Sequence, residues 1–165
     1  MCCFYLFLDD QNPFPYLEAK IKAGDGVITS AVFKGDNHRL YFFVTEDEII
    51  YFDFEKQLFW TGGGTVRFAR TDTVTSGNYA DRFCIGDEDY TVVYGTVNSE
   101  TVFSIEIHMA NGEVLPVVPD QDGFFLVQLL WNSAVELCAY DKAGNLLYQD
   151  YISGDDPWLY ESWNE

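Results

Sequence analysis

The chain has 165 residues and a formal net charge of −18, with 27 Asp and Glu against nine Lys and Arg. A hydrophobic share of 48%, which includes 14 Phe, 11 Tyr and 4 Trp, supplies a folded core and excludes intrinsic disorder. A surface this acidic repels phosphate backbones and anionic lipids, so it argues against nucleic-acid binding and favours cationic partners, although solubility alone also explains the acidity.

The N-terminal residues MCCFYLFLDDQ contain an apolar run at positions 2–8. A membrane-spanning helix needs about 20 residues, so this run is too short to cross a bilayer. It has no basic region before it and no small-residue cleavage site, so it is not a recognisable signal peptide. Two interpretations remain open: the first strand of the domain, or the tail of a longer export or anchor segment in which Cys2 or Cys3 carries a lipid.

The first expected element after this run is a helix within NPFPYLEAKIKAGDG, residues 12–26. Pro15 suits the first turn of a helix, and Gly24 suits the position just past its end. Leu17 and Ile21 lie about one turn apart and predict the apolar face of this helix, with Tyr16 as a further candidate member. Such a short helix is stable only when it packs on another element.

Period-two alternation then predicts strands at residues 27–33, 40–45 and 48–54. The sequence KQLFWTGGGTVRFAR, residues 56–70, predicts two further short strands around Gly62–Gly64, where three glycines allow a hairpin loop or a bulge. A phosphate-binding loop is a poor interpretation, because neither a Gly-Lys-Ser/Thr sequence nor a helix signal follows the glycines.

Residues 73–89 lose the alternation and are expected to form a connector. Beyond them, Asn111-Gly112 and Ala143-Gly144-Asn145 are hairpin-turn sequences, because Asn and Gly accept a positive φ. Alternation predicts six strands in this half, at residues 90–97, 101–110, 113–118, 123–130, 134–141 and 145–152. Antiparallel strands at this spacing are typical of an immunoglobulin-like sandwich.

The predicted fold is therefore mainly β. A short N-terminal helix and a β-meander occupy residues 1–72 and pack beside a C-terminal antiparallel immunoglobulin-like β-sandwich at residues 90–152. Residues 73–89 connect the two, and residues 153–165 form an acidic, aromatic tail. The sequence contains no internal repeat and no low-complexity tract.

Glu106 and His108 are a candidate metal-binding pair. Alternate residues of a strand share a face, so these two side chains point to the same side, about 7 Å apart along the strand. They supply two ligands and the sequence identifies no third nearby, so a solvent-facing strand explains them. His38 lies in the polar stretch KGDNHR, which a hairpin loop explains. We therefore expect no catalytic residue, no cofactor and no metal ion.

The sequence PDQDGFF, residues 119–125, resembles part of a calcium-binding loop. Aligning Gly123 with the glycine of an EF-hand leaves no carboxylate at the first and twelfth positions, so an EF-hand is excluded. A β-turn is the better interpretation, and a loose Ca²⁺ site at Asp120 and Asp122 remains open.

The four cysteines, Cys2, Cys3, Cys84 and Cys138, lack a CxxC or other zinc-binding spacing. Cys84 and Cys138 either form a disulfide, if the chain is exported, or are buried free thiols. The sequence alone does not set the distance between them.

The C-terminal sequence SGDDPWLYESWNE combines aromatic side chains with four carboxylates. Pro157 suits the start of a short helix that places Leu159 and Trp163 on one side. Two roles remain open for the aromatic residues. They cover a sheet of their own domain, or they dock a protein partner through Trp158, Tyr160 and Trp163, since Trp and Tyr dominate interface energetics.

Strand and turn residues over most of the chain form a recognisable set: Leu17-Glu18-Ala19, Gly26-Val27-Ile28, Tyr41-Phe42-Phe43, Phe59-Trp60, Tyr94-Gly95-Thr96-Val97, Val102, Ile105, Ile107, Asn111-Gly112, Gly123-Phe124-Phe125, Ala139-Tyr140-Asp141 and Gly144-Asn145-Leu146. This set resembles small exported or lipid-anchored β-proteins of Gram-positive bacteria, most of which are uncharacterised. The resemblance implies an extracytoplasmic, membrane-anchored location and brings no catalytic residue to this chain.

The sequence thus predicts a non-catalytic extracytoplasmic module that binds or senses through protein–protein contact. The alternative is an acidic cytoplasmic inhibitor or immunity-type protein that neutralises a basic partner such as a nuclease toxin, because acidic surfaces accelerate the capture of basic proteins. Carbohydrate binding through exposed aromatic side chains is a third hypothesis. Membrane association is expected only through a possible missing N-terminal anchor.

Overall fold

The structure is a computed structural model and describes residues 14–36, 38–56, 60–85, 88–131 and 133–152. Side chains are described in these ranges except at residues 14, 60–63 and 78–85. The chain is mainly β and divides into two compact units. Unit 1 comprises residues 1–71 and 83–87, and unit 2 comprises residues 72–82 and 88–165.

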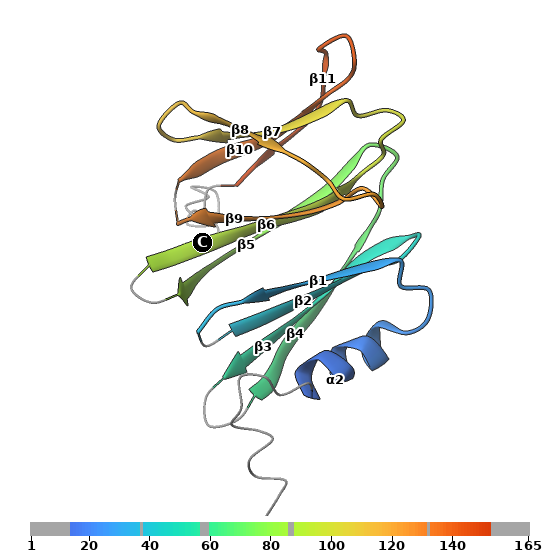
Figure 1. Ribbon diagram of the computed structural model, residues 1–165, viewed down its shortest axis with the longest axis vertical. Coiled ribbons are helices and arrows are strands. Elements are labelled where there is room, and N and C mark those ends of the chain that lie inside the picture. The colour runs from blue at the N-terminus through green and yellow to red at the C-terminus, as the bar shows by residue number, and fades with distance from the viewer. Residues whose placement is uncertain (1–13, 37, 57–59, 86–87, 132, 153–165) are drawn as a thin grey trace, which may run out of the picture. The chain divides into compact units, whose positions relative to one another are not determined.

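Helix α2 (Phe14–Ala23) confirms the predicted helix and its predicted end (Figure 1). Gly24 follows the last helical residue with a φ of 83°, and its N–H donates to the Lys20 carbonyl oxygen at 3.2 Å. A left-handed glycine in this position satisfies a carbonyl that the helix itself leaves without a partner. The chain therefore leaves the helix where the sequence places the glycine.

The face by which α2 packs differs from the prediction. Leu17 and Ile21 are 50% and 79% exposed, whereas Ala19 and Ala23 are buried. Alanine has no side chain beyond Cβ, so the helix backbone approaches the sheet closely there, and the aromatic side chains of the sheet supply the bulk of this core. The expectation of a buried apolar face is therefore wrong for Leu17 and Ile21, whereas Tyr16, its third candidate member, packs against the core.

Four strands form the sheet of unit 1 in the order β1-β2-β3-β4, namely β1 (Thr29–Lys34), β2 (His38–Val44), β3 (Glu48–Lys56) and β4 (Trp60–Ala69). Strands β1 to β3 confirm the predicted alternating segments. Residues on one face of β2 and β3 form a core with the two helix alanines: Tyr41, Phe43, Ile50, Phe52 and Phe54. The ring of Tyr16 extends this core, with its centroid 5.8 Å from that of Tyr41.

Strand β4 runs through all three glycines, so the expectation of two short strands around them is wrong. Asp53 of β3 pairs with Gly64 and Phe54 pairs with Gly62, which leaves Gly63 as the extra residue of a β-bulge. The bulge, which was one of the two interpretations of the glycine run, is confirmed. An additional residue without a side chain is accommodated with little steric cost at such a position.

Residues 73–89, which were expected to form a connector, instead contain strand β5 (Val74–Ile85) and the start of β6 (Glu88–Val97). Strand β5 lies at the edge of a sheet next to β6. Its sequence, VTSGNYADRFCI, is polar and contains glycine, so it has little alternation of its own. Pairing with a strong neighbouring strand outweighs this weak local preference.

Unit 2 is a two-sheet sandwich. Its remaining strands are β7 (Ser104–Met109), β8 (Val114–Val117), β9 (Phe124–Leu130), β10 (Ala134–Tyr140) and β11 (Leu146–Tyr151). One sheet has the order β5-β6-β9 and the other the order β11-β10-β7-β8 (Figure 1). The chain changes sheet after β6, after β8 and after β9, which confirms the predicted sandwich of immunoglobulin-like type.

Inward-facing residues of both sheets of unit 2 form one core, including Val93, Val97, Phe125 and Leu129 from the first sheet and Ile105, Ile107, Leu137 and Ala139 from the second. The two sheets are also linked at their edges. The hydroxyls of Ser76 on β5 and Tyr148 on β11 lie 2.9 Å apart, and Ser76 Oγ donates to Asp150 Oδ2 at 3.2 Å. With the inner faces occupied in this way, the alternate residues of β7 and β10 point away from the core.

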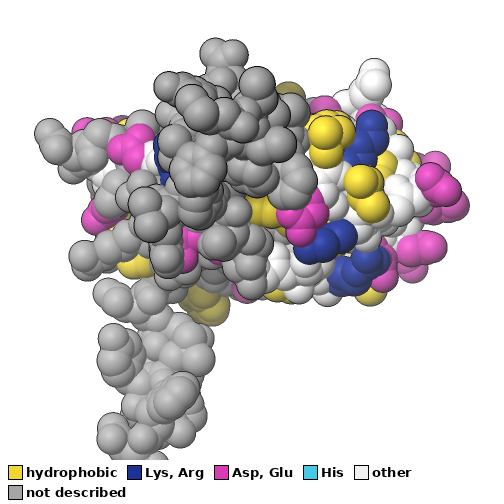
Figure 2. All heavy atoms as spheres, turned by 90° about the horizontal axis from the view of Figure 1, so that it is seen from below, with side chains coloured by type: hydrophobic (Ala, Val, Ile, Leu, Met, Phe, Trp, Pro, Cys, Tyr) yellow, Lys and Arg dark blue, Asp and Glu magenta, His cyan; other side chains and the backbone are white. Residues whose placement is uncertain are grey.

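The two units differ in charge. Unit 2 holds 16 of the 27 acidic residues and two of the nine basic ones, a net charge of −14, whereas unit 1 holds 11 acidic and seven basic residues, a net charge of −4. On the face shown in Figure 2, Lys and Arg side chains lie among Asp, Glu and hydrophobic side chains. Lys22 Nζ and Glu18 Oε1 on helix α2 form an ion pair at 2.6 Å. Most of the acidic excess therefore belongs to the residues of unit 2.

Candidate functional site

Four ionisable side chains come together on the outer face of the β11-β10-β7-β8 sheet. In the antiparallel pairing of β7 and β10, His108 lies opposite Glu136 and Glu106 lies opposite Cys138. Residues opposite each other in a sheet have Cβ atoms about 5 Å apart, so two alternate positions on each strand form a compact group of four. We call Glu106, His108, Glu136 and Cys138 the β7–β10 cluster.

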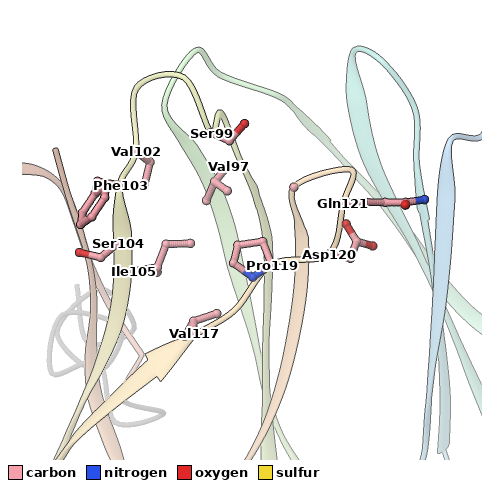
Figure 3. A pocket seen from close by; sticks show the side chains of 11 residues that line it. Val97, Ser99, Val102, Phe103, Ser104, Ile105, Val117, Pro119, Asp120 and Gln121 are labelled. Atoms are coloured by element: carbon pink, nitrogen blue, oxygen red, sulfur yellow. The ribbon is translucent and has the colours of Figure 1, made fainter. Parts of the chain in front are cut away.

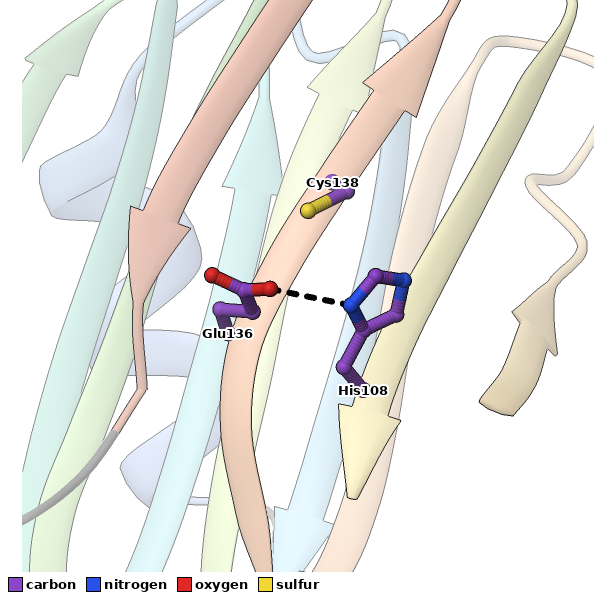
Figure 4. Close-up of side chains that lie close together, drawn as sticks. All are labelled: His108, Glu136 and Cys138. Atoms are coloured by element: carbon purple, nitrogen blue, oxygen red, sulfur yellow. Dashed lines mark hydrogen bonds and ion pairs between the residues drawn. The ribbon is translucent and has the colours of Figure 1, made fainter. Parts of the chain in front are cut away.

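The imidazole of His108 lies between the two carboxylates of this cluster, and Figure 4 shows its contact with Glu136. His108 Nδ1 is 2.9 Å from Glu136 Oε1, and His108 Nε2 is 3.6 Å from Glu106 Oε2. The second carboxylate oxygen of Glu136 accepts a hydrogen bond from Gln149 Nε2 on β11. Each ring nitrogen of His108 thus faces a carboxylate, and the ring is held in one orientation.

Cys138 adds a thiol to the cluster. Its side chain is 2% exposed, and the residue is a free cysteine. A ring nitrogen of His108, a carboxylate oxygen of Glu136 and Sγ of Cys138 all lie within 4.8 Å of one another. The expectation that Glu106 and His108 have no third potential ligand nearby is therefore wrong, because β10 brings two.

Protonation in the cluster follows from these contacts. The hydrogen bonds from Gln149 and then His108 lower the pKa of Glu136, so this carboxyl group is ionised at neutral pH. Burial raises the pKa of the Cys138 thiol, so the thiol stays protonated there. A nucleophilic cysteine needs a lowered pKa and access to substrate. Cys138 has neither, so the arrangement does not favour cysteine catalysis.

A cavity of about 240 Å³ lies at one end of the sandwich, between the loop at 98–103 and the loop at 118–123. Figure 3 shows Val97, Ile105 and Pro119 around its centre. Asp120 is the only ionisable residue that lines it, within the described part of the chain. The cavity can take a small apolar group, but it lacks the paired groups that acid–base chemistry needs.

The carboxylate of Asp120 closes the turn that borders this cavity. Asp120 Oδ1 accepts hydrogen bonds from the backbone N–H groups of Asp122 and Phe124, both at 2.9 Å. Gly123 follows with a φ of 80°, and its N–H donates to the Asp120 carbonyl oxygen. The predicted β-turn is confirmed. No set of three closely spaced metal-ligand side chains includes Asp120 or Asp122 in the described residues.

The Asp120→Ala substitution is expected to lower the free energy of unfolding by about 1–2 kcal/mol, because it removes the acceptor of two backbone N–H groups. Asp122→Ala is the matched control. Asp122 contributes its backbone N–H to the turn, which alanine retains, so its replacement is expected to change stability by less than about 0.5 kcal/mol. Urea unfolding of the two variants measures the difference, and equal losses would contradict this role of Asp120.

The structure places the other predicted site residues as follows. His38 begins strand β2, with Nδ1 at 3.4 Å from Asp53 Oδ1 on β3, so it belongs to a strand rather than to a loop. The side chain of Cys84 lies outside the described residues, as do Cys2, Cys3 and the aromatic residues of the tail, Trp158, Tyr160 and Trp163. No helix in the described residues is long and apolar enough to cross a membrane.

Glu136 and Cys138 are the residues that sequence reasoning missed. A signal for them was present, because Glu-x-Cys on β10 repeats the spacing of Glu-x-His on β7. No family model, no curated protein and no solved structure matches the chain, so these comparisons assign no role to the two residues.

Proposed function

We propose that this chain is a non-catalytic binding module that acts through protein–protein contact, and that its sandwich unit binds a partner with a basic surface. The observation that carries the proposal is the net charge of −14 on unit 2, where 16 acidic residues are accompanied by two basic ones. A field of one sign over one unit raises the rate at which an oppositely charged protein is captured.

The outer face of the β11-β10-β7-β8 sheet is the surface that suits such contact best. The register places Val114, His108, Glu136 and Tyr151 in one row across the four strands. Val114 and Tyr151 at the ends of this row are 52% and 68% exposed. Apolar and aromatic side chains that flank ionised groups provide both a contact area and a charge for a basic partner.

The charge of this face is incompletely neutralised within the described part of the chain. The ion pairs of Glu106 and Glu136 there are both with His108, and a histidine is charged only when protonated. At neutral pH the carboxylate of Glu136 is ionised, since Gln149 and His108 lower its pKa. An arginine or lysine of a partner can therefore form charge-assisted hydrogen bonds there.

The test is a binding measurement with a matched pair of aromatic variants. The wild-type chain captures its partner from an extract of the native source, and the purified partner is then titrated with each variant. Tyr151→Ala is expected to weaken binding at least about tenfold, because Tyr151 is 68% exposed on this face and tyrosines are among the residues that contribute most to interface energetics. Phe103→Ala, at a residue 70% exposed beside the cavity at the end of the sandwich, is expected to change affinity less than about twofold.

The salt dependence of the association rate tests the electrostatic part. The rate is expected to fall by about tenfold or more from low to high ionic strength if the acidic sandwich steers a basic partner. A partner with an acidic surface, or a rate that does not depend on salt, would contradict the proposal.

The inhibitor form of this hypothesis differs in what the partner does. Here the partner is a basic enzyme such as a nuclease, and the same −14 charge of unit 2 favours it. Its activity, assayed with and without the chain, separates the two forms: an inhibitor abolishes turnover at a stoichiometry of one to one, whereas a tethered module leaves it unchanged.

The compartment remains part of the proposal. The resemblance of the strand and turn residues to exported proteins supports an extracytoplasmic module, and the inhibitor form requires the cytoplasm. Fractionation of the native source, followed by immunodetection, measures which compartment holds the protein.

A further inference from the structure

Beyond partner binding, we propose that the β7–β10 cluster is a binding site for one transition-metal ion, with Zn²⁺ the best fit. The ligands are His108 Nδ1, a carboxylate oxygen of Glu136 and Sγ of Cys138, and Glu106 orients the imidazole from its other nitrogen. The Cys138 thiol loses its proton to solvent as the metal–sulfur bond forms, because the thiolate is the form that binds Zn²⁺.

The distances place the three ligand atoms close to what one ion requires. Zn²⁺ has bonds of about 2.0–2.3 Å in a tetrahedral arrangement, so its ligand atoms lie about 3.5 Å apart. The three atoms of this cluster lie within 4.8 Å of one another, and His108 Nδ1 is already 2.9 Å from Glu136 Oε1. The largest separation that this bound allows exceeds the tetrahedral spacing by about 1.3 Å, so the proposal requires only side-chain adjustments of about this size.

The sheet fixes these positions before any ion arrives. His108 and Glu136 face each other across two neighbouring strands, and Cys138 is the next outward residue on β10. The intervening residues Ile107 and Leu137 are fully buried in the sandwich core, which fixes the direction in which the ligands point. Sites built on strands in this way hold their geometry better than sites built on loops.

Glu106 completes the arrangement from the far side of the imidazole. Its Oε2 lies 3.6 Å from His108 Nε2, the nitrogen that faces away from Glu136. Metal-binding histidines usually donate their second N–H to a carboxylate, which fixes the tautomer and increases the basicity of the binding nitrogen. The Glu106 carboxylate is positioned to accept that proton when Nδ1 binds the ion.

The chemistry of the ligand set selects among metals. A sulfur ligand together with an imidazole nitrogen favours Zn²⁺ and related ions, whereas Ca²⁺ and Mg²⁺ prefer oxygen ligands alone. Three protein ligands leave a fourth position for water or for a side chain of a bound molecule. The site lies on the outer face of the sheet. Its sulfur side is covered, because Cys138 is nearly inaccessible to solvent.

Cobalt is the probe that reports on both the sulfur ligand and the geometry. Titration of the full chain with Co²⁺ is expected to produce a sulfur-to-cobalt charge-transfer band in the near ultraviolet and d–d bands in the visible, both saturating at one ion per chain. Addition of Zn²⁺ is expected to bleach both bands, because Zn²⁺ binds such sites more tightly than Co²⁺.

The other thiols of the chain are removed for this experiment. A background in which Cys2, Cys3 and Cys84 are replaced by serine leaves Cys138 as the one remaining thiol. In this background His108→Gln and Cys138→Ser are each expected to weaken Zn²⁺ binding by more than about tenfold, because loss of residues that merely orient ligands already costs about 10–100-fold. The charge-transfer band is expected to vanish in Cys138→Ser.

His38→Gln is the matched control, since His38 also pairs with a carboxylate, Asp53, but in unit 1 and outside any three-ligand set of the described residues. It is expected to leave the Co²⁺ spectrum and the affinity for Zn²⁺ unchanged. If the serine background does not fold, the same two substitutions are compared in the wild-type chain, where the band is expected to fall by the contribution of one site.

Three results of these experiments would overturn the proposal, and a fourth comes from a titration with Ca²⁺. They are a charge-transfer band that persists undiminished in Cys138→Ser, an affinity for Zn²⁺ that His38→Gln lowers as much as His108→Gln does, and the absence of binding in native mass spectrometry of the folded wild-type chain at an excess of Zn²⁺. Binding of Ca²⁺ in place of Zn²⁺ at this site would equally contradict it.

Discussion

Replacing Phe52 by alanine is expected to lower the free energy of unfolding by about 3–5 kcal/mol, because a buried aromatic side chain is lost and a cavity is left behind. Phe52 is buried in the core between helix α2 and the sheet of unit 1. Its ring makes an edge-to-face contact with that of Phe43, with centroids 5.8 Å apart. The two helix alanines contribute little volume, so the aromatic rings of the sheet provide most of the packing.

Urea unfolding followed by circular dichroism measures this loss. The control is Val32→Ala on β1, at a side chain that is exposed, and it is expected to cost less than about 1 kcal/mol. A loss below about 1 kcal/mol for Phe52→Ala would contradict the position of this ring at the centre of the unit 1 core.

The substitution Gly95→Ala is expected to destabilise the sandwich by about 3 kcal/mol, at the upper end of the usual cost of overpacking. Gly95 lies in β6, the central strand of the β5-β6-β9 sheet. A Cβ atom there would overlap the carbonyl oxygen of Thr75 and lie 2.6 Å from Cζ of Phe125. The backbone of β5 cannot move away without losing its pairing with β6, so the strain is not relieved by a side-chain rotation alone.

Gly64→Ala is the control for this substitution. Gly64 is a strand glycine without a left-handed φ, and a Cβ atom added there would meet no other atom within 4 Å. Its replacement is expected to be neutral or to stabilise the chain by up to about 0.5 kcal/mol, because alanine restricts the unfolded chain more than glycine does. Equal effects of the two substitutions in thermal unfolding would contradict the close approach at Gly95.

The features of the fold that could be predicted are those that residues close together in the sequence determine. Alternation identified β1 to β3 and the strands of the sandwich from β6 onward, and the hairpin sequence at Asn111-Gly112 lies where Gly112 has a φ of 87°. Pro15 and Gly24 marked the ends of helix α2. In each of these cases the local preference and the final structure agree.

The two main errors in the fold concern features that distant residues decide. Strand β5 has weak alternation and exists because β6 offers it a partner. Helix α2 has two candidate apolar faces. The face with Ala19 and Ala23 is the one that packs against the aromatic side chains of the sheet. Neither the partner strand nor the facing surface is visible in the local sequence.

The candidate site was likewise predictable only where it depends on residues of a single strand. Glu106 and His108 share a strand, so their common face was predictable from alternation. Their meeting with Glu136 and Cys138 depends on which strand pairs with β7 and in which register. A shift of one residue in that register would point Glu136 and Cys138 into the core, so only the buried face of β10, with Leu137 and Ala139, sets the arrangement.

The two proposals share one face of the sandwich, yet they are separable by experiment. Tyr151→Ala removes a contact at the end of the row and leaves all four residues of the β7–β10 cluster in place. Cys138→Ser removes a proposed metal ligand that is buried and so offers little surface to a protein partner. A chain that loses its partner but keeps Zn²⁺, or the reverse, identifies which proposal fails.

The claim that the outer face of the β11-β10-β7-β8 sheet is the binding surface is tested most directly by nuclear magnetic resonance. The isotope-labelled chain is titrated with its basic partner, and amide shifts are followed along both units. We expect the changes to concentrate at His108, Val114, Glu136 and Tyr151, with the amides of β1 to β3 unmoved. Changes confined to β1 to β3, with those four amides unaffected, would contradict the claim.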